Sequence, residues 1–171
     1  MVRILVAFGL LVAGLFTWIQ AQSETRSNLL LFSPVNGQLL DHGKPMAGQT
    51  IQRMYLWNME KKPHYDNTLT DSQGRFHFDE IRGSAEYGFF AQLFNQPVIL
   101  QDIYLLLPDK KIDFYFHSRQ NHRNCEETGY PDIQITFDVS KTRFNGDAQA
   151  YFGDSEIKNI PLFERKEDCN Y

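Results

Sequence analysis

The segment NTLTDSQGRFHF, residues 67–78, brings together an aspartate, a serine and a histidine, the side-chain types of a serine hydrolase. Such chemistry requires Asp71 and His77 to converge on the hydroxyl that lies between them in sequence. The two phenylalanines of the segment stand two residues apart, however, which is the spacing of a strand with one face turned inward. Asp71 can accept a hydrogen bond from the backbone two residues on, and Gly74 can adopt the positive φ that closes a tight hairpin. The segment therefore predicts a turn that shapes the fold, not a catalytic site.

Other motifs that carry chemistry are not found in the sequence. It has neither a Gly-x-Ser-x-Gly elbow nor a His-Glu-x-x-His helix, and no Gly-rich loop opens a helix. His117 and His122 lie near Cys125, but their spacing matches no common zinc pattern. The oxygen-rich segments 66–74 and 145–156 lack the twelve-residue spacing of a calcium loop. We therefore expect no enzyme, metal or cofactor, with a small hydrolase or metal protein using His117 and His122 as the alternative. The histidines, each expected at a solvated surface, are His42, His64, His77, His117 and His122.

The amino terminus is built like a secretory signal peptide. Arg3 is followed by an uncharged, mostly apolar run and then by small and polar residues, which predicts cleavage after Ala21. An uncleaved membrane anchor is the alternative, because the uncharged run approaches the ~20 residues that span a bilayer. Without Arg3 the chain has 16 basic against 21 acidic side chains, so its formal net charge moves from −4 to −5. An acidic exported chain without basic clusters is a poor match for nucleic acid.

The two cysteines, Cys125 and Cys169, both fall in the exported part of the chain, where thiols are usually oxidised. We expect them to form one disulfide that ties the carboxy-terminal tail to a loop. A metal site at this loop would need the thiolate that the disulfide removes.

Short alternating segments separated by turn residues predict an all-β protein. In residues 132–139 the apolar side chains are two apart, and in 111–117 Ile112, Phe114 and Phe116 are expected to share one face. Residues 105–116 are typical of a hairpin that turns through Pro108 to Lys110. Such strands favour an antiparallel sandwich or small barrel. The further expected strands are 29–33, 37–40, 50–57, 86–94 and 98–107.

The order of turn motifs over residues 33–117 resembles the carboxypeptidase regulatory-like domains, which are also described as prealbumin-like or transthyretin-like sandwiches. The segment VNGQLLDHGKPMAGQTIQ holds a Gly-Lys-Pro turn, and TLTDSQGRFHF holds the Thr-Asp-x-x-Gly-x-Phe element that forms a hairpin in that family. The resemblance implies an Ig-like or prealbumin-like sandwich over 29–117, followed by a disulfide-tied extension over 118–171 packed on the same domain. The fold-defining turn residues would be Gly37, Gly43, Pro45, Gly48, Asp71 and Gly74.

The resemblance implies a binding, spacing or structural module and no activity. We therefore expect a non-enzymatic protein, periplasmic or secreted, that binds another protein of the bacterial envelope; a periplasmic immunity protein that neutralises an interbacterial toxin is its most concrete version. A glycan-binding or structural envelope protein is the alternative. Contact with the membrane is expected only through an uncleaved amino-terminal segment. Function is expected on the 118–131 loop and the tail beyond Asn145, and the candidate partner-binding residues are Tyr55, Trp57, His117, His122 and Tyr130. The aromatic residues that could form an apolar patch or a sugar platform are Tyr55, Trp57, Tyr65 and Tyr130.

Overall fold

The computed structural model describes residues 24–60, 62–87, 96–144, 151–157 and 169. The expected signal peptide lies outside the described residues, as does most of the strand expected over 86–94. No helix in the described part of the chain is long and apolar enough to cross a membrane.

The chain forms two compact units. The first comprises residues 1–29 and 83–96, and the second comprises 30–82 and 97–171. Strands β1 (Glu24–Phe32) and β7 (Ile81–Tyr87) pair with each other as a two-stranded sheet. The side chains discussed below all belong to the second unit.

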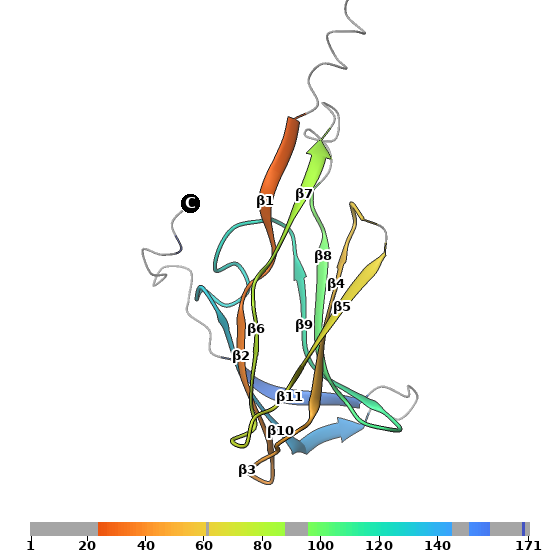
Figure 1. The fold of residues 1–171 in the computed structure, drawn as a ribbon, viewed down its shortest axis with the longest axis vertical. Helices are drawn as coiled ribbons and strands as arrows, with labels where there is room; N and C mark the ends of the chain where they lie inside the picture. The colour runs from red at the N-terminus through yellow and green to blue at the C-terminus, as the bar shows by residue number, and fades with distance from the viewer. Residues whose placement is uncertain (1–23, 61, 88–95, 145–150, 158–168, 170–171) are drawn as a thin grey trace, which may run out of the picture. The chain divides into compact units, whose positions relative to one another are not determined.

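The second unit is built around a nine-stranded sheet whose strand order is β3-β2-β10-β11-β9-β8-β4-β5, with β6 paired to β2 (Figure 1). Most neighbours are antiparallel, but β10 runs parallel to β2 and β11 runs parallel to β9. The expected all-β, mainly antiparallel sandwich is therefore confirmed. The strands are β2 (Val35–Asp41), β3 (Lys44–Pro45), β4 (Thr50–Trp57), β5 (Pro63–Leu69), β6 (Arg75–Phe78), β8 (Ile99–Leu106), β9 (Lys111–Arg119), β10 (Ile133–Phe144) and β11 (Tyr151–Ile157).

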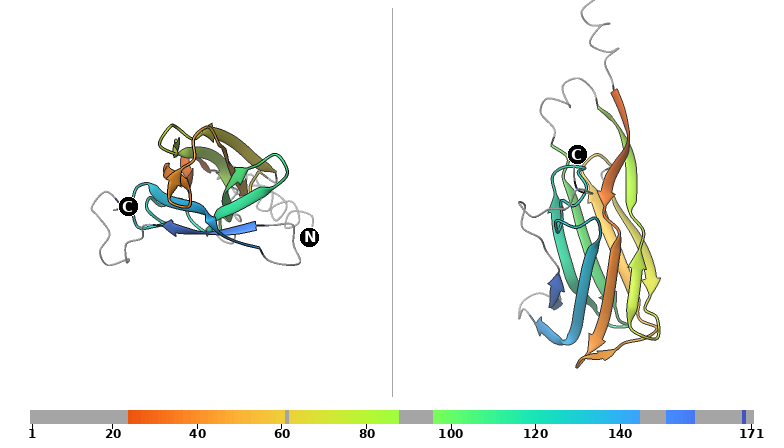
Figure 2. Two further views of the ribbon diagram at one scale, coloured as in Figure 1. Left: turned by 90° about the horizontal axis from the view of Figure 1, so that it is seen from below. Right: turned by 90° about the vertical axis from the view of Figure 1, so that its left-hand side faces the viewer.

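The sheet is strongly curled (Figure 2), and aromatic side chains pack on its inner side. The ring of Phe76 on β6 lies 6.0 Å from that of Phe114 on β9, and Phe114 stacks on Phe137 of β10 at 4.7 Å. Along β4 every second residue is buried, as a strand with one inward face requires. One of these residues is charged: Arg53 is 2% exposed, donates two hydrogen bonds to Asp66 and lies over two phenylalanine rings.

The turn at residues 70–75 has the predicted local chemistry. Asp71 accepts hydrogen bonds from the backbone N–H groups of Gln73 and Arg75, each at 2.8 Å, and Gly74 has a φ of 71°. It is not a hairpin, however, because β5 pairs with β4 whereas β6 pairs with β2. The turn therefore carries the chain from one end of the curled sheet to the other.

Two other predicted hairpins are confirmed. Strands β2 and β3 pair antiparallel around His42 and Gly43, whose φ values are 50° and 74°. Strands β8 and β9 pair antiparallel, and the N–H of Leu107 donates to the carbonyl of Lys110 across their turn.

A β-bulge in β9 overturns one expected orientation. Tyr115 lies opposite Ile103 and Asp113 opposite Tyr104, so Phe114 is the extra residue between them. Phe114 and Tyr115 are both buried, at 3% and 5% exposed. The alternation of inward and outward side chains along β9 is therefore shifted by one residue after Phe114. Phe116, which simple alternation placed in the core with Phe114, is instead 68% exposed.

Candidate binding surface

Two of the predicted binding residues are in the core. Tyr55 and Trp57 occupy inward positions of β4 and are 9% and 0% exposed, so they form no exposed platform. The ring of Tyr55 stacks on His64 at 4.8 Å, and that of Trp57 meets His122 edge-on at 5.6 Å. Their aromatic area contributes to the core and not to a binding surface.

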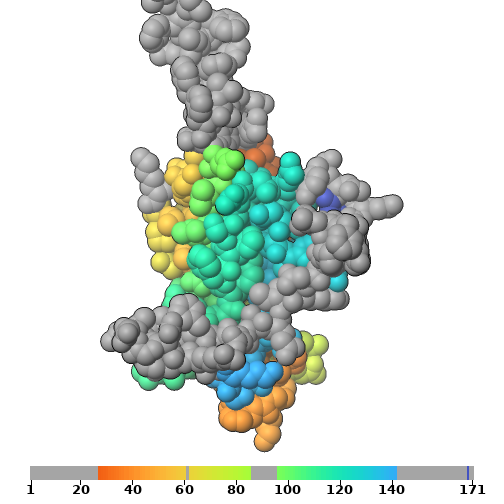
Figure 3. All heavy atoms as spheres, turned by 180° about the vertical axis from the view of Figure 1, so that it is seen from behind, coloured from red at the N-terminus to blue at the C-terminus, as the bar shows by residue number. Residues whose placement is uncertain are grey.

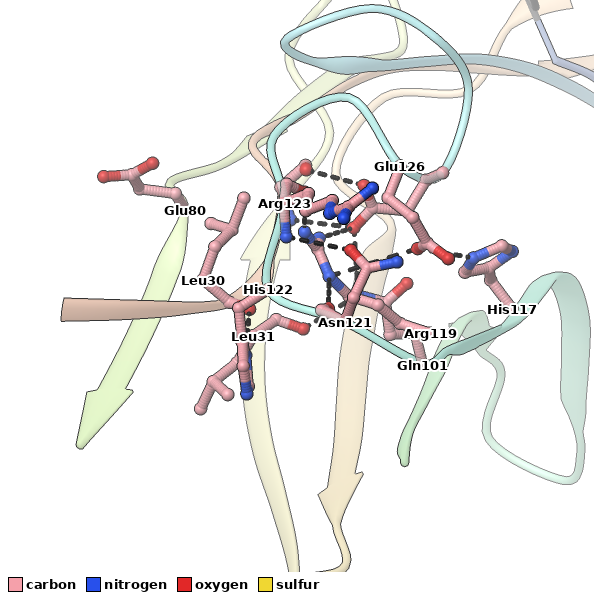
Figure 4. Close-up of polar contacts among 12 residues, drawn as sticks. Leu30, Leu31, Glu80, Gln101, His117, Arg119, Asn121, His122, Arg123 and Glu126 are labelled. Atoms are coloured by element: carbon pink, nitrogen blue, oxygen red, sulfur yellow. Dashed lines mark hydrogen bonds and ion pairs between the residues drawn. The ribbon is translucent and has the colours of Figure 1, made fainter. Parts of the chain in front are cut away.

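The loop after β9, where the sequence placed function, is held by a buried ionic network (Figure 4). Arg119 is 0% exposed and its guanidinium reaches Glu127 at 2.5 Å. The same guanidinium donates hydrogen bonds to the backbone carbonyls of Asn121, at 2.7 Å, and Arg123. Glu127 in turn accepts a hydrogen bond from the hydroxyl of Ser33 at 2.8 Å. One buried guanidinium therefore fixes the path of the loop from residue 121 to residue 127.

The electrostatics of Glu127 identify the network as a structural one. Burial pushes the pKa of Glu127 upward, but the Arg119 charge and hydrogen bonds from Gln101 and Ser33 outweigh it and lower the pKa overall. Glu127 is thus held ionised by bonds to Arg119, Gln101 and Ser33, which tie it to the surrounding strands and loop. We assign Arg119 and Glu127 to loop architecture.

The remaining predicted residues of this loop lie at the margin of the network. His117 is half-buried and pairs with Glu126 at 3.1 Å, while His122 contacts the carbonyl oxygen of Leu30 at 3.0 Å. Tyr130 is half-buried further along the loop. His117 and His122 are thus engaged with different neighbours and do not converge with each other on a common point (Figure 4).

The predicted disulfide is present and joins Cys125 to Cys169. Both thiols of the chain are therefore used, and the loop cannot supply a thiolate ligand. Among the described residues no group of three or more His, Cys, Asp or Glu side chains is arranged to hold a metal ion.

An exposed apolar surface lies elsewhere, on the outer face of β5, β4, β8 and β9. Figure 3 shows this side of the molecule, with β8 and β9 in green to teal. Tyr65 on β5, Leu69 on β5 and Phe116 on β9 are 57%, 64% and 68% exposed. The pairing register aligns Tyr65 with Met54, Met54 with Asp102 and Asp102 with Phe116, so these four residues form one row across four strands. We call this surface the Tyr65–Phe116 face. Its other apolar members, all half-buried, are Leu56, Leu100 and Leu106.

A polar cluster lies in the middle of the Tyr65–Phe116 face. The ammonium of Lys111 is 2.8 Å from Asp113 and 3.4 Å from Asp102, and it lies 3.9 Å from the centre of the Tyr104 ring. The hydroxyl of Tyr104 donates to Gln52. Two carboxylates thus share one ammonium group between the exposed apolar side chains of this face.

Asp102 is the unusual member of this cluster. It is 9% exposed, and its Oδ1 atom has no hydrogen-bond partner. Burial, followed by the negative charge of Asp113, raises the pKa of Asp102 from 3.8 to about 6, against the opposing effect of Lys111. The carboxylate of Asp102 is therefore ionised at neutral pH, and Lys111 neutralises its negative charge only in part.

The opposite outer face, over β2, β6 and β10, carries an open groove of about 850 Å³, and Leu69 at the end of β5 lies where this groove adjoins the Tyr65–Phe116 face. Phe76 and Ile135 also line the groove, but its exposed side chains are mostly polar and hydrogen-bonded. Asn36 donates to the neighbouring Asp132 at 2.8 Å and contacts His77 at 2.8 Å. The groove has no exposed large apolar side chain apart from Leu69 at its margin. We regard it as solvated surface and use it below as a control region.

The fold thus defines an all-β, sandwich-like protein with an exposed apolar face on one side of the sheet. The chain belongs to the family of the domain of unknown function DUF6795, whose model matches residues 35–141. The match begins at β2 and ends in β10, so it contains every residue of the Tyr65–Phe116 face. Neither the curated proteins nor the solved structures contain a match to this chain.

Apart from Tyr65, the members of the Tyr65–Phe116 face were missed because their positions depend on pairing between distant strands. A period of two along β5 and β8 indicates which residues share a face, but it does not say which face is solvated. A signal for Phe116 was present in the run Phe114-Tyr115-Phe116, since three consecutive aromatic residues cannot all face inward from a regular strand.

Proposed function

We propose that this protein is a non-enzymatic binding module that docks another protein on the Tyr65–Phe116 face. The observation that carries the proposal is the exposure of three large apolar side chains, Tyr65, Leu69 and Phe116, on one face of a hydrogen-bonded sheet. Grouped exposed apolar side chains mark interaction sites, and Tyr and Phe are enriched at the centre of protein interfaces. Paired strands hold these side chains in place before binding, which lowers the entropic cost of association.

The dimensions of the face suit the centre of an interface. Four strands at ~4.8 Å spacing are about 15 Å wide, and six residues along them extend about 20 Å. A stable interface buries about 800 Å² on each partner. The apolar face therefore supplies the core of such a contact, and the polar residues around it supply the rim.

Several features support an envelope location for this role. The amino-terminal sequence has the pattern of a signal peptide, and the Cys125–Cys169 disulfide is consistent with an oxidising compartment. The tight turn at Gly43 between paired strands supports a carboxypeptidase regulatory-like module, a class that binds or spaces other components. The acidic net charge suits a basic partner, and a secreted toxin that this protein neutralises is the most concrete example.

The glycan-binding alternative has lost its main support. It relied on exposed Trp57 and Tyr55, and both are buried. Stacking on a sugar ring requires an exposed aromatic face. Of the aromatic residues considered for that role, Tyr65 alone is exposed in the described part of the chain. The protein-binding proposal accounts for the exposure of Tyr65, Leu69 and Phe116 together, and we favour it for that reason.

The proposal is tested by capture of the partner with matched variants. The tagged full chain is expressed in the organism that carries it, crosslinked in the cell, and its co-purifying proteins are identified. The same is done with Tyr65→Ser/Phe116→Ser and with His77→Ser/Gln134→Ser, a control on the opposite outer face. We expect one stoichiometric protein that is lost from the first variant and kept by the second.

Two results would contradict the proposal. Retention of the partner by Tyr65→Ser/Phe116→Ser would move the binding site away from the Tyr65–Phe116 face. Recovery of cell-wall fragments in place of a protein would favour the glycan-binding alternative. Circular dichroism and melting of both variants ensure that loss of binding does not reflect loss of folding.

A further inference from the structure

The two ends of the nine-stranded sheet differ in how their edges are protected from pairing with another strand. At one end β2 is covered by two short strands, β3 and β6. β3 consists of Lys44 and Pro45 alone, the residue types that block strand addition in natural sheets. In β6 the N–H of Arg75 is already bonded to the carboxylate of Asp71 at 2.8 Å. At the other end, within the described part of the chain, β5 pairs with β4 on one side only (Figure 1).

Strand β5 carries little protection along its free edge. Pro63 is its first residue, so the missing N–H affects only one end of the strand. The carboxylate of Asp66 is neutralised by Arg53, which donates two hydrogen bonds to it. From Tyr65 to Leu69 the strand has no proline and no lysine, and its register with β4 has no bulge. Residues 65–69 are therefore open to pairing with an added strand.

The direction of the backbone groups of β5 follows from the alternation of an antiparallel strand. The N–H of Thr70, just after β5, donates to the carbonyl of Gln49 at 3.0 Å and so points toward the β4 side. Backbone groups of alternate residues point to the same side. The groups of the even-numbered residues of β5 therefore face β4, and those of Tyr65, Asn67 and Leu69 point outward. These outward groups form no backbone hydrogen bond within the described residues.

The residues with outward backbone groups are also the outermost members of the Tyr65–Phe116 face. Tyr65 and Leu69 are 57% and 64% exposed, and Asn67 between them is exposed as well. A strand added beside β5 would place every second side chain on this face, ~5 Å from Tyr65 and Leu69 across the new pair. Strand addition thus accounts for large apolar side chains on the last strand of the sheet, where no neighbouring strand covers their flanks.

We propose that the partner protein adds an extended segment to the free edge of β5. The segment bonds to the backbone groups of residues 65, 67 and 69 and places apolar side chains beside Tyr65 and Leu69. This inference rests on the proposed docking role of the Tyr65–Phe116 face and specifies how the partner engages it. Main-chain hydrogen bonds supply affinity in such complexes, and alternate side chains supply specificity. A second copy of this chain fits less well, because each copy has a formal net charge of −4 and repels the other, whereas a basic segment is attracted.

The test uses a peptide of defined sequence in place of the unidentified partner. The ¹⁵N-labelled protein is titrated at pH 7.5 with the capped peptide Lys-Thr-Val-Thr-Val-Thr-Lys, which alternates apolar and polar side chains and is basic. The control peptide, Lys-Thr-Val-Pro-Pro-Thr-Lys, cannot donate from either edge at its centre. We expect saturable chemical-shift changes with the first peptide, largest at the amides of residues 65, 67 and 69, and none that saturate with the control.

Two substitutions at one position separate the backbone from the side chain. Asn67→Pro removes the central outward N–H, a change that an edge strand tolerates where the N–H faces solvent. It should weaken peptide binding at least fivefold. Asn67→Ala loses the same side-chain hydrogen bond with Gln52 but keeps the N–H, so it should leave peptide binding unchanged. In the native host, Asn67→Pro should lose the captured partner and Asn67→Ala should keep it, and melting of both variants checks that they are folded.

Several outcomes would overturn the inference: no saturation with the strand-forming peptide, equal binding of the control peptide, or equal binding by Asn67→Pro and Asn67→Ala. A concentration-dependent dimer of the free protein that Asn67→Pro abolishes would assign the edge to a second copy instead. The inference and the proposed function fail separately. If the peptide fails to bind while Tyr65→Ser/Phe116→Ser still loses its captured partner, the docking face stands and the partner engages it through side chains without adding a strand.

Discussion

Three buried charges in the second unit are compensated to different degrees. Arg53 forms two hydrogen bonds with Asp66, and Arg119 pairs with Glu127 inside a network of donors. Asp102 shares a single ammonium with Asp113. Buried charges that are fully paired can be tolerated, whereas an incompletely paired charge lowers stability. Arg53 and Arg119 therefore stabilise the fold, whereas the ionised carboxylate of Asp102 lowers its stability.

Asp102→Asn is expected to stabilise the protein at neutral pH. The folded-state pKa of Asp102 is raised from 3.8 to about 6, so the folded protein binds this proton more tightly than the unfolded chain does. Ionisation of Asp102 therefore lowers the free energy of unfolding. This effect is absent below about pH 4 and complete above about pH 6, where it amounts to at most about 3 kcal/mol. Urea unfolding of the wild type and the variant at pH 4, 5, 6 and 7.5 measures the difference. A gain of the same size at pH 4 and 7.5 would be inconsistent with this origin.

Arg119→Leu is expected to lower the free energy of unfolding by about 3–5 kcal/mol, because it leaves Glu127 buried without its cation. The double variant Arg119→Leu/Glu127→Leu should recover most of that loss, since it removes both charges together. Chemical denaturation of the wild type, both single variants and the double variant gives the coupling energy. The structural role would be refuted if Arg119→Leu cost less than about 1 kcal/mol or if the double variant were the least stable.

At the scale of single elements, the bulge in β9 decides what the sheet presents to solvent. A regular strand would place Phe114 and Phe116 on the same face and Tyr115 on the other. The extra residue at Phe114 turns Tyr115 inward and Phe116 outward. One inserted residue thus converts a core aromatic into a surface aromatic, and bulges are commonly used to redirect a side chain near a site.

Phe114→Ala and Phe116→Ala should therefore behave differently although the residues are two apart. Phe114 is 3% exposed and packs against Phe76 and Phe137, so its truncation should cost about 3–4 kcal/mol. Phe116 is exposed, so its truncation should change stability by less than about 0.5 kcal/mol. Thermal melting of the two variants distinguishes the bulged strand from a regular one, in which both truncations would be costly.

The turn between β5 and β6 is a second element whose geometry is set by one residue. Gly74 has a φ of 71°, and a Cβ atom there would lie 2.3 Å from the carbonyl oxygen of Leu39. Gly43 has a similar φ of 74°, but a Cβ atom there would meet nothing within 4 Å. The two glycines share the backbone conformation and differ in the clash.

Gly43→Ala should cost about 1 kcal/mol, the usual penalty of the left-handed region, whereas Gly74→Ala should cost at least about 2 kcal/mol. Gly74→Ala has the larger effect because its Cβ atom also displaces the backbone of β2. Partner capture by the folded Gly74→Ala variant should persist, since the turn lies outside the Tyr65–Phe116 face. Equal destabilisation by the two substitutions would mean that the conformation alone, without the clash, sets the cost.

In the molecule as a whole, pairing between distant segments assembles both the fold and the candidate surface. Strand β10 lies parallel to β2, with Ile133 opposite Val35, and the disulfide links Cys125 to Cys169 across 44 residues. The formal net charge is −4, so the surface attracts basic partners and repels acidic ones.

The sequence predicted the local features of this fold well and its long-range features poorly. Alternation identified β9 and β10, flanking turn residues indicated β4 and β8, and turn chemistry identified Gly43 and Gly74, because these signals lie within a few residues. The partner of β6, the parallel pairing of β10 and the bulge at Phe114 depend on tertiary packing. The aromatic pair Tyr55 and Trp57 was assigned to the surface because alternation along β4 does not reveal which side faces the core.

The central claim, that a protein partner docks on the Tyr65–Phe116 face, is tested most directly by site-specific photocrosslinking in the native host. A photoreactive phenylalanine analogue is placed at position 116 in one variant and at position 134, on the opposite outer face, in another. The account predicts one discrete protein adduct from position 116 that Tyr65→Ser weakens, and none from position 134. An adduct from position 134 without one from position 116 would contradict it.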